Sequence, residues 1–176
     1  MDQVPNDPRP ELRQRLSEWR TEFHALVDRI SPDEWEGKSG NAAWSVRQVV
    51  GHLAAQPDAC VRLVDLTRRG QGMLNRPPAR VLDLVNLWMV RLTTRGETPV
   101  KARDHFDAGH RLLVARLEDI RVDEFSIASR SFRQPISVAD CFRGLGSQLA
   151  DHGPQVLAGI RPTSPATGPV GTVARS

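Results

Sequence analysis

Apolar residues recur along most of the chain at alternating steps of three and four, a spacing typical of one buried helix face. The first such stretch runs from about residue 8 to residue 30, with apolar positions at Leu12, Leu16, Trp19, Phe23, Leu26 and Ile30. Asp7 and Pro8 predict its start as an N-cap followed by proline at the first helical position. Ser31 and Pro32 predict its end.

A second helix is predicted to begin at Ser45, because Ser45 and Gln48 have the spacing of a capping box. Its apolar face is carried by Val46, Val49, Val50, Leu53, Cys60, Val61 and Val64. Pro57 lies inside this stretch and lacks the backbone N–H that a continuous helix needs. We therefore expect a kink just beyond His52.

Three more helices follow from the same pattern. They are predicted over about residues 77–92, 99–120 and 137–160, the last opened by Ser137 and Asp140 as an N-terminal cap. The apolar stripe of the last helix includes polar positions and consists of Val138, Cys141, Leu145, Gln148, His152 and Val156. Between the fourth and last helices lies an irregular stretch, and we see no convincing strand anywhere in the chain.

Four long helices and one shorter helix predict an all-α fold, an up-down four-helix bundle with one extra helix, over residues 8–160. Residues 1–7 are expected to be a flexible N-terminus. The segment 161–176 is rich in Pro, Gly, Ser and Thr and has no periodicity, so it is expected to be a disordered tail.

Composition limits the number of domains, the residue types of the core and the class of partner. A chain of 176 residues with 39% hydrophobic content suits one domain. Aromatic residues make up only 5% and there is no Tyr, so we expect a core of Leu, Val and Ala. The net charge is +3, and the arginines are scattered among acidic residues rather than gathered on one face. That pattern favours a solvated surface over a nucleic-acid partner.

Cysteine usage, the N-terminal sequence and the length of the apolar runs indicate the cellular compartment. Cys60 and Cys141 lie in apolar helical context without the spacing of a metal or disulfide motif. The polar, Pro-rich N-terminus is unlike a signal peptide, and no apolar run has transmembrane length. We therefore expect a cytoplasmic protein with no membrane partner.

The candidate chemistry comes from polar residues at core positions. Cys141, Gln148 and His152 fall within about 40° of one another on a continuous helix. His110 occupies the seam of the fourth helix, and His52 flanks the apolar face of the second, with Gln56 one turn beyond. Buried imidazoles and amides need mutual hydrogen bonds or a metal ion. Bundles build metal sites from inward side chains on facing helices.

Each of these residues also has a purely structural interpretation. His52 could bond a loop carbonyl at the edge of the core, and Gln148 and His152 could pair with each other one turn apart. Cys141 fits a small buried hydrophobic residue. His110 fits a satisfied core histidine as well as a site residue, and His24 and His105 fall off the core stripes.

Three motifs resemble the DinB/YfiT-like superfamily over roughly residues 10–160. The segment "WSVRQVVGHLA" (44–54) is similar to the family's Trp-Ser helix start followed by an aliphatic pair and a histidine. Asp83 and Asn86 resemble the Asp-x-x-Asn that opens a middle helix. Gln148, His152, Gln155 and Val156 resemble the family's H-x-x-x-H-x-x-Q-I. The group includes relatives of the N-terminal domain of mycothiol-dependent maleylpyruvate isomerase.

The resemblance implies a four-helix bundle with a divalent metal, often zinc or nickel, bound by three histidines. Carried onto this sequence, the ligands are His52, Gln148 and His152. Gln148 departs from the family's histidine, and an amide oxygen is a weaker zinc ligand than imidazole. His110 or Cys141 would be the replacement donors, and Pro154 is expected to distort the turn that aims His152. Arg47 and Asn86 are candidates for the mouth of a pocket.

The function implied by the resemblance is a metal-dependent, thiol-dependent transferase or isomerase that acts on a small electrophile, with mycothiol as the thiol. Two alternatives remain open. One is a non-catalytic binding or stress-related protein with a degenerate metal site, and the other is a metal-assisted hydrolase. The expected partner is a small-molecule substrate, and the expected state is a monomer or homodimer.

Overall fold

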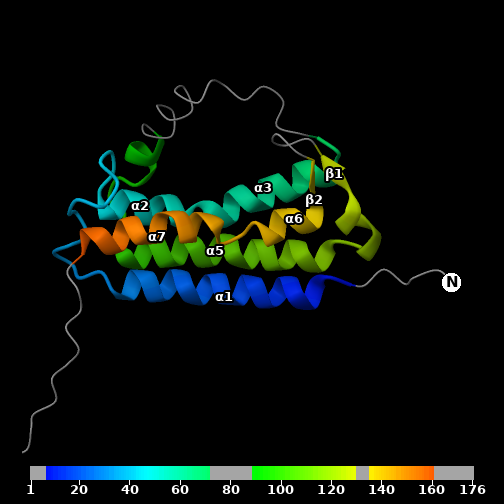
Figure 1. Cartoon of the computed structure of the whole chain (residues 1–176), viewed down its shortest axis with the longest axis horizontal. Coiled ribbons are helices and arrows are strands. Elements are labelled where there is room, and N and C mark those ends of the chain that lie inside the picture. The colour runs from blue at the N-terminus through cyan, green and yellow to red at the C-terminus, as the bar shows by residue number, and fades with distance from the viewer. Residues whose placement is uncertain (1–6, 72–88, 130–134, 161–176) are drawn as a thin grey trace, which may run out of the picture.

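The computed structural model describes residues 7–71, 89–129 and 135–160 (Figure 1). The expected flexible N-terminus and disordered tail therefore lie almost wholly outside the described residues. So does most of the expected third helix, with Asp83 and Asn86, although residues 89–93 at its end are helical. Within the described ranges, no helix combines the length and the apolar character needed to cross a membrane.

The described chain is mainly helical, as predicted. The helices are α1 (Arg9–Asp28), α2 (Val46–Ala54), α3 (Gln56–Arg68), α5 (Pro99–Asp119), α6 (Val138–Arg143) and α7 (Ser147–Gly159), with a short 3-10 helix at Val122–Ser126. Two-residue strands, β1 (Ala128–Ser129) and β2 (Ile136–Ser137), pair antiparallel. This small pairing corrects the expectation that the chain has no strand.

Side-chain caps mark the starts of α2, α5 and α6. Ser45 and Gln48 form the predicted reciprocal box at α2, and Ser137 with Asp140 does the same at α6. At α1 the helix starts at Arg9, one residue later than predicted, and the Arg9 N–H donates to Asp7 Oδ1 at 3.1 Å. Pro57 divides the second helix into α2 and α3 at Ala55, so the predicted kink is a junction between two helices.

The prediction of one continuous last helix is wrong. Gly144 ends α6, and Gly146 then adopts a φ of 85°, a left-handed conformation that glycine reaches without strain. The chain resumes as α7 one residue later. This break removes the common helix face that was expected to hold Cys141, Gln148 and His152, because Cys141 belongs to α6 and the other two belong to α7.

Ion pairs show how the helices run relative to one another. Arg13 pairs with Glu118 and Arg20 with Asp107, so α1 and α5 are antiparallel. Between α3 and α5 the residue numbers of the paired side chains instead increase together along both helices. These pairs are Asp58 with His105, Asp65 with Arg116 and Arg68 with Asp119. Helices α3 and α5 are therefore parallel, as Figure 1 also shows.

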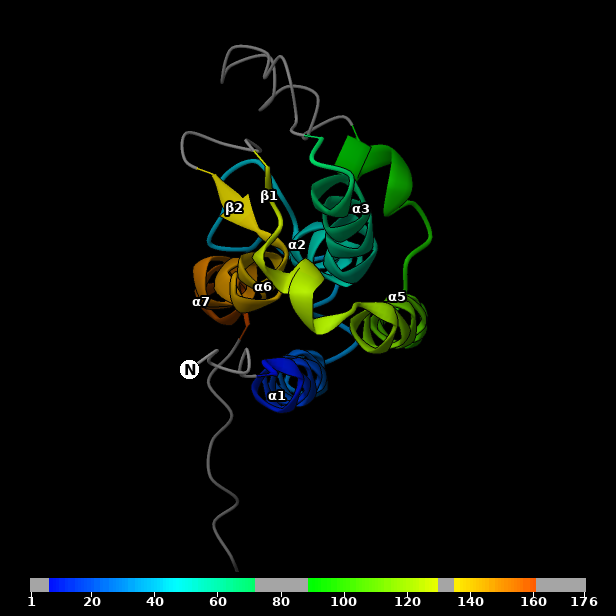
Figure 2. The same ribbon diagram turned by 90° about the vertical axis from the view of Figure 1, so that its right-hand side faces the viewer.

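The chain therefore reverses direction between α1 and α2–α3 and again between α5 and α6–α7. It does not reverse between α3 and α5. The end of α3 at Arg68 and the start of α5 at Pro99 therefore lie at opposite ends of the bundle, as in four-helix bundles with a crossover connection. Viewed end-on, α1, α5, α3 and the α6–α7 arm surround one shared core (Figure 2).

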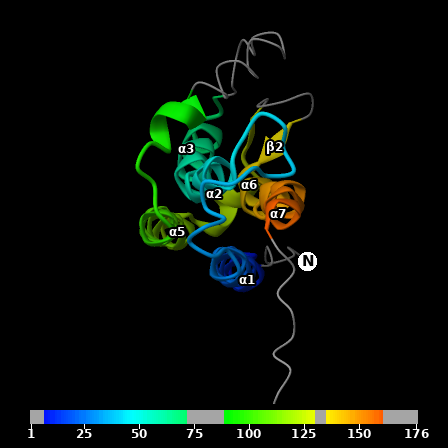
Figure 3. The same ribbon diagram turned by 90° about the vertical axis from the view of Figure 1, so that its left-hand side faces the viewer.

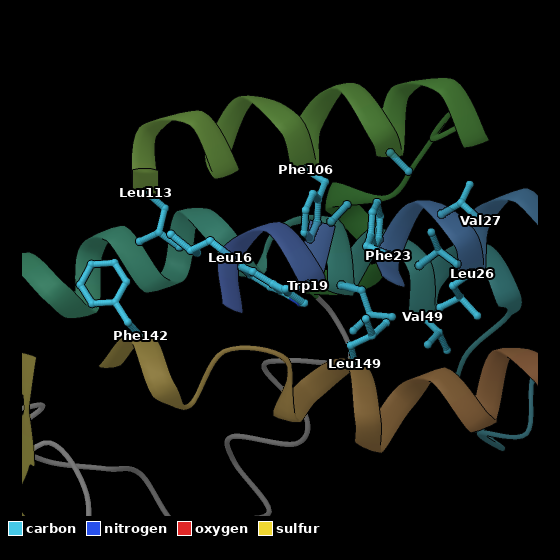
Figure 4. Packing of buried hydrophobic residues seen from close by; sticks show 14 of the residues in the cluster. Leu16, Trp19, Phe23, Leu26, Val27, Val49, Phe106, Leu113, Phe142 and Leu149 are labelled. Carbon is cyan, nitrogen blue, oxygen red and sulfur yellow. The ribbon is translucent and has the colours of Figure 1, made fainter. Parts of the chain in front are cut away.

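That core is mainly aliphatic, as the composition predicts, with a few aromatic rings at its centre (Figure 4). Phe23 of α1 stacks on Phe106 of α5 with ring centres 4.1 Å apart, and Trp19 meets Phe106 edge-on at 4.9 Å. Phe106 and Phe23 have no exposed surface. Aromatic pairs in such geometries add to the free energy gained by burial.

We expect Phe106→Ala to lower the free energy of unfolding by about 3–5 kcal/mol, because it removes a fully buried ring and leaves a cavity between α1 and α5. Urea unfolding followed by circular dichroism measures the change. Leu112→Ala is the matched control, since Leu112 lies on the same helix and is 59% exposed, and it should change stability by less than about 0.5 kcal/mol. Equal effects of the two substitutions would contradict the packing described above.

Candidate functional site

The loop before α2 is held against α7 at one end of the bundle (Figure 3). The Gly40 N–H donates to the carbonyl oxygen of Gln155 at 2.7 Å. Gly159 approaches the loop so closely that a Cβ there would meet the carbonyl oxygen of Lys38 at 2.4 Å. On the other side, Trp35 Nε1 donates to the carbonyl oxygen of Glu97 at 2.9 Å. The loop is therefore fixed to both α7 and the turn before α5.

Three side chains from α2 and α7 converge beneath this loop. His52 Nε2 lies 3.5 Å from Gln148 Oε1, and the ring centres of His52 and His152 are 5.3 Å apart. All three side chains are half-buried. The structure thus brings together the three residues that the sequence singled out, and Pro154, which lies inside α7, does not draw the His152 ring away.

Trp44 forms an apolar wall over the two imidazoles. Its ring centre lies 5.1 Å from that of His52 and 5.9 Å from that of His152. Trp44 directly precedes the Ser45 cap of α2, so the cap that starts the helix also sets the position of the indole. A wall of this kind shields the imidazoles from water on one side.

His52 has two polar neighbours that make opposite demands on the same atom. Gln56 Nε2 lies 3.2 Å from His52 Nε2 and can only donate, so that contact requires an unprotonated Nε2. Gln148 Oε1 can only accept, so it requires a proton on the same nitrogen. A neutral His52 can satisfy one of the two amides at a time.

The electrostatic environment favours the neutral form of His52. Burial lowers the pKa of His52 below its ordinary value. The contact with Gln148 raises that pKa, and the nearby His152 ring lowers it again. An imidazole kept neutral retains a lone pair, and a lone pair is what a metal ion or a proton donor uses.

His152 is held by a different set of partners. Its Nδ1 lies 3.1 Å from Gln155 Oε1, and Asn41 Nδ2 donates to the same oxygen at 3.2 Å. This contact leaves His152 Nε2 free of any hydrogen bond within the described residues. One sequence signal indicates this arrangement, the placement of Gln155 three residues after His152.

The separations within the cluster are compatible with one shared tetrahedral ion. Two donors at about 2.1 Å from such an ion lie about 3.4 Å apart, and two imidazole rings bound to it have centres about 5 Å apart. However, no three His, Cys, Asp or Glu side chains within 7–71, 89–129 and 135–160 lie together as a metal-binding group. The candidate donor set is therefore two imidazoles and the amide oxygen of Gln148.

The replacement donors suggested by the sequence lie elsewhere. His110 is buried, and its Nε2 lies 3.0 Å from the carbonyl oxygen of Leu16, so it is a satisfied core histidine. Cys141 is buried on α6 with its Sγ 3.5 Å from Thr67 Oγ1, and burial raises the pKa of its thiol. The hypothesis that His110 or Cys141 supplies a replacement donor to the cluster is therefore wrong.

The other candidates have structural partners. His24 is half-buried against Asp107, and His105 is exposed beside Asp58. Arg47 donates to the carbonyl oxygen of Thr94 at 3.0 Å and pairs with Glu36, so it ties α2 to the turn before α5.

A cavity of about 330 Å³ reaches His52 from the side of α3 and α5. His52 and Gln56 form part of its wall, together with Asp58, His105 and the turn that carries Thr94 and Glu97. Its volume lies at the lower end of the range for small-molecule sites. The sequence did not indicate this cavity, because its walls come from segments that meet only through the parallel pairing of α3 and α5.

One protein-family model matches the chain. The family model described as the DinB superfamily matches residues 15–156, a range that includes Trp44, His52, Gln148 and His152. Comparison with the curated proteins and with the solved structures gave no match. The family match covers most of the chain and agrees with the helical bundle that the structure describes. The chain therefore belongs to the DinB superfamily.

Proposed function

We propose that His52, Gln148 and His152 bind one divalent metal ion, zinc or nickel, and that the site catalyses a thiol-dependent transferase or isomerase reaction on a small electrophile. The observation that supports it is the convergence of two imidazoles and one amide oxygen at separations that suit a tetrahedral ion. Three protein ligands leave a fourth position open, as in catalytic rather than structural sites.

The chain's own residues would prepare the reaction. Burial lowers the pKa of His52 and so favours the neutral ring that metal binding would require. The amide of Gln155 holds the His152 ring, and Trp44 excludes water from one side of the pair. A bound divalent ion would lower the pKa of a thiol placed beside it. Mycothiol is the thiol that the family resemblance suggests, and the cavity beside His52 has room for a small electrophile.

A second candidate is a binding protein whose metal site has degenerated. Gln148 favours it, because a neutral amide oxygen replaces an imidazole. The contact between Gln56 and His52 favours it too, since that amide can occupy the same lone pair that a metal would need. The two candidates differ in whether the native protein binds metal.

We expect metal-stripped protein to bind one zinc or nickel ion per chain in isothermal titration calorimetry. His152→Ala should weaken binding by about 100-fold or more, because it removes one of only two nitrogen ligands. His24→Ala is the matched control, as His24 is a half-buried imidazole that contacts Asp107 instead of the cluster. A native protein that takes up neither ion would exclude the catalytic proposal.

Gln148→His should raise metal affinity by about tenfold or more, since imidazole is the stronger ligand for zinc and nickel. Gln14→His places a histidine on the exposed face of α1 and serves as the control. The same titration decides between the two candidates. Weak native binding that Gln148→His strengthens supports the enzyme, whereas binding that exists only in Gln148→His supports the degenerate site.

Catalysis is expected to require an added thiol. With a chloronitrobenzene as the electrophile, the rate above the uncatalysed reaction should depend on mycothiol and should disappear in His152→Ala. Product formation followed by absorbance measures it. Hydrolysis of a small ester that proceeds without thiol and also needs His152 would instead favour the metal-assisted hydrolase.

A further inference from the structure

The hydrogen bonds around His152 form a directed chain that starts at a backbone group. The Ala43 N–H donates to Asn41 Oδ1 at 2.9 Å. A backbone N–H can only donate, so this contact fixes which end of the Asn41 amide is oxygen and which is nitrogen. Asn41 Nδ2 therefore faces the other way, towards α7.

The second step passes this orientation to Gln155. Asn41 Nδ2 donates to Gln155 Oε1 at 3.2 Å, and Gln155 Nε2 turns back towards the carbonyl oxygen of Asp151 at 3.5 Å. The short backbone bond between Gly40 and Gln155 keeps the two amides within reach of each other. Each amide is thus oriented by a group whose donor or acceptor character is unambiguous.

The third step reaches the imidazole. Gln155 Oε1 can only accept, and it lies 3.1 Å from His152 Nδ1, so the Nδ1 atom must carry the proton in the neutral ring. The lone pair is then on Nε2. In a neutral imidazole, a hydrogen bond made by one ring nitrogen decides which of the two nitrogens carries the proton.

We propose that Asn41 and Gln155 are positioning residues that select the Nδ1–H tautomer of His152 and so present its Nε2 lone pair to the space shared with His52. The loop before α2 thereby controls the chemistry of a histidine on α7. The tautomer selection does not depend on a metal. Only its consequence for metal affinity rests on the proposed function.

The test reads the tautomer directly. In isotope-labelled, metal-stripped full-length protein at about pH 8, where free imidazole is neutral, the nitrogen chemical shifts of His152 distinguish the two tautomers by NMR. His152→Ala assigns the signals. The native protein should show Nδ1–H. Gln155→Met removes the acceptor at similar side-chain length and should abolish the preference for Nδ1–H, whereas Gln155→Glu keeps an acceptor and should retain it.

Asn41→Asp provides a sharper arm of the same experiment. A carboxylate at this position accepts but cannot donate, so the Gln155 amide should rotate and present Nε2 to both neighbours. His152 should then carry its proton on Nε2. An unchanged Nδ1–H signal in Asn41→Asp would overturn the step through Asn41, and an unchanged signal in Gln155→Met would overturn the whole chain.

Two controls separate these outcomes from misfolding and from failure of the metal proposal. Gln14→Met changes an exposed glutamine on α1, and all variants should retain the native helical circular dichroism signal. If the native protein binds metal, Gln155→Met should weaken binding by about 10–100-fold and Gln155→Glu should not. A native protein that binds no metal but shows the expected tautomers would refute the proposed function and leave this inference standing.

Discussion

The backbone hydrogen bond between Gly40 and Gln155 is the contact on which the polar cluster depends. It joins the loop before α2, which carries Asn41 and Trp44, to the last turns of α7, which carry His152 and its partner Gln155. Gly159 allows the approach, because any side chain there would collide with the loop backbone. Without this contact, α2 and α7 would still pack, but their histidines would lack a common wall and a common set of partners.

The interior shows two ways of accommodating polar groups. His110 Nε2 donates to the carbonyl oxygen of Leu16, and Thr67 contacts both Cys141 and Ser129, so these groups have partners inside the core. The cluster of His52, Gln148 and His152 differs, since two amides compete for one nitrogen of His52. A core that needs only stability satisfies its polar groups fully, and incomplete satisfaction is commonest at functional sites.

Much of this architecture could be predicted from the sequence. The periodic stripes predicted α1 and α5 closely, and the Ser45–Gln48 and Ser137–Asp140 boxes predicted two helix starts. Those signals are local, so no knowledge of packing was needed. The convergence of His52, Gln148 and His152 was also expected, but it came from the family resemblance together with the spacing rather than from periodicity alone.

The errors have a common physical origin. The apolar stripe continues in phase across Gly144 and Gly146, so periodicity could not reveal the left-handed turn that separates α6 from α7. Cys141 was consequently assigned to the wrong neighbourhood. Helix phase carries no information about which helices become neighbours. For this reason the sequence suggested the wrong donors, His110 and Cys141. It also did not indicate the cavity beside His52 or the contact between Asn41 and Gln155.

The parallel arrangement of α3 and α5 has a consequence for how the chain folds. Antiparallel neighbours joined by a short turn can meet early, whereas two parallel helices meet only after a long loop has closed. The ion pairs along this seam, such as Asp65 with Arg116, are partly exposed and contribute little to holding it. Association of α3 with α5 therefore requires the chain between Arg68 and Pro99 to bring their ends together, and the cavity wall that contains His52 is completed only afterwards.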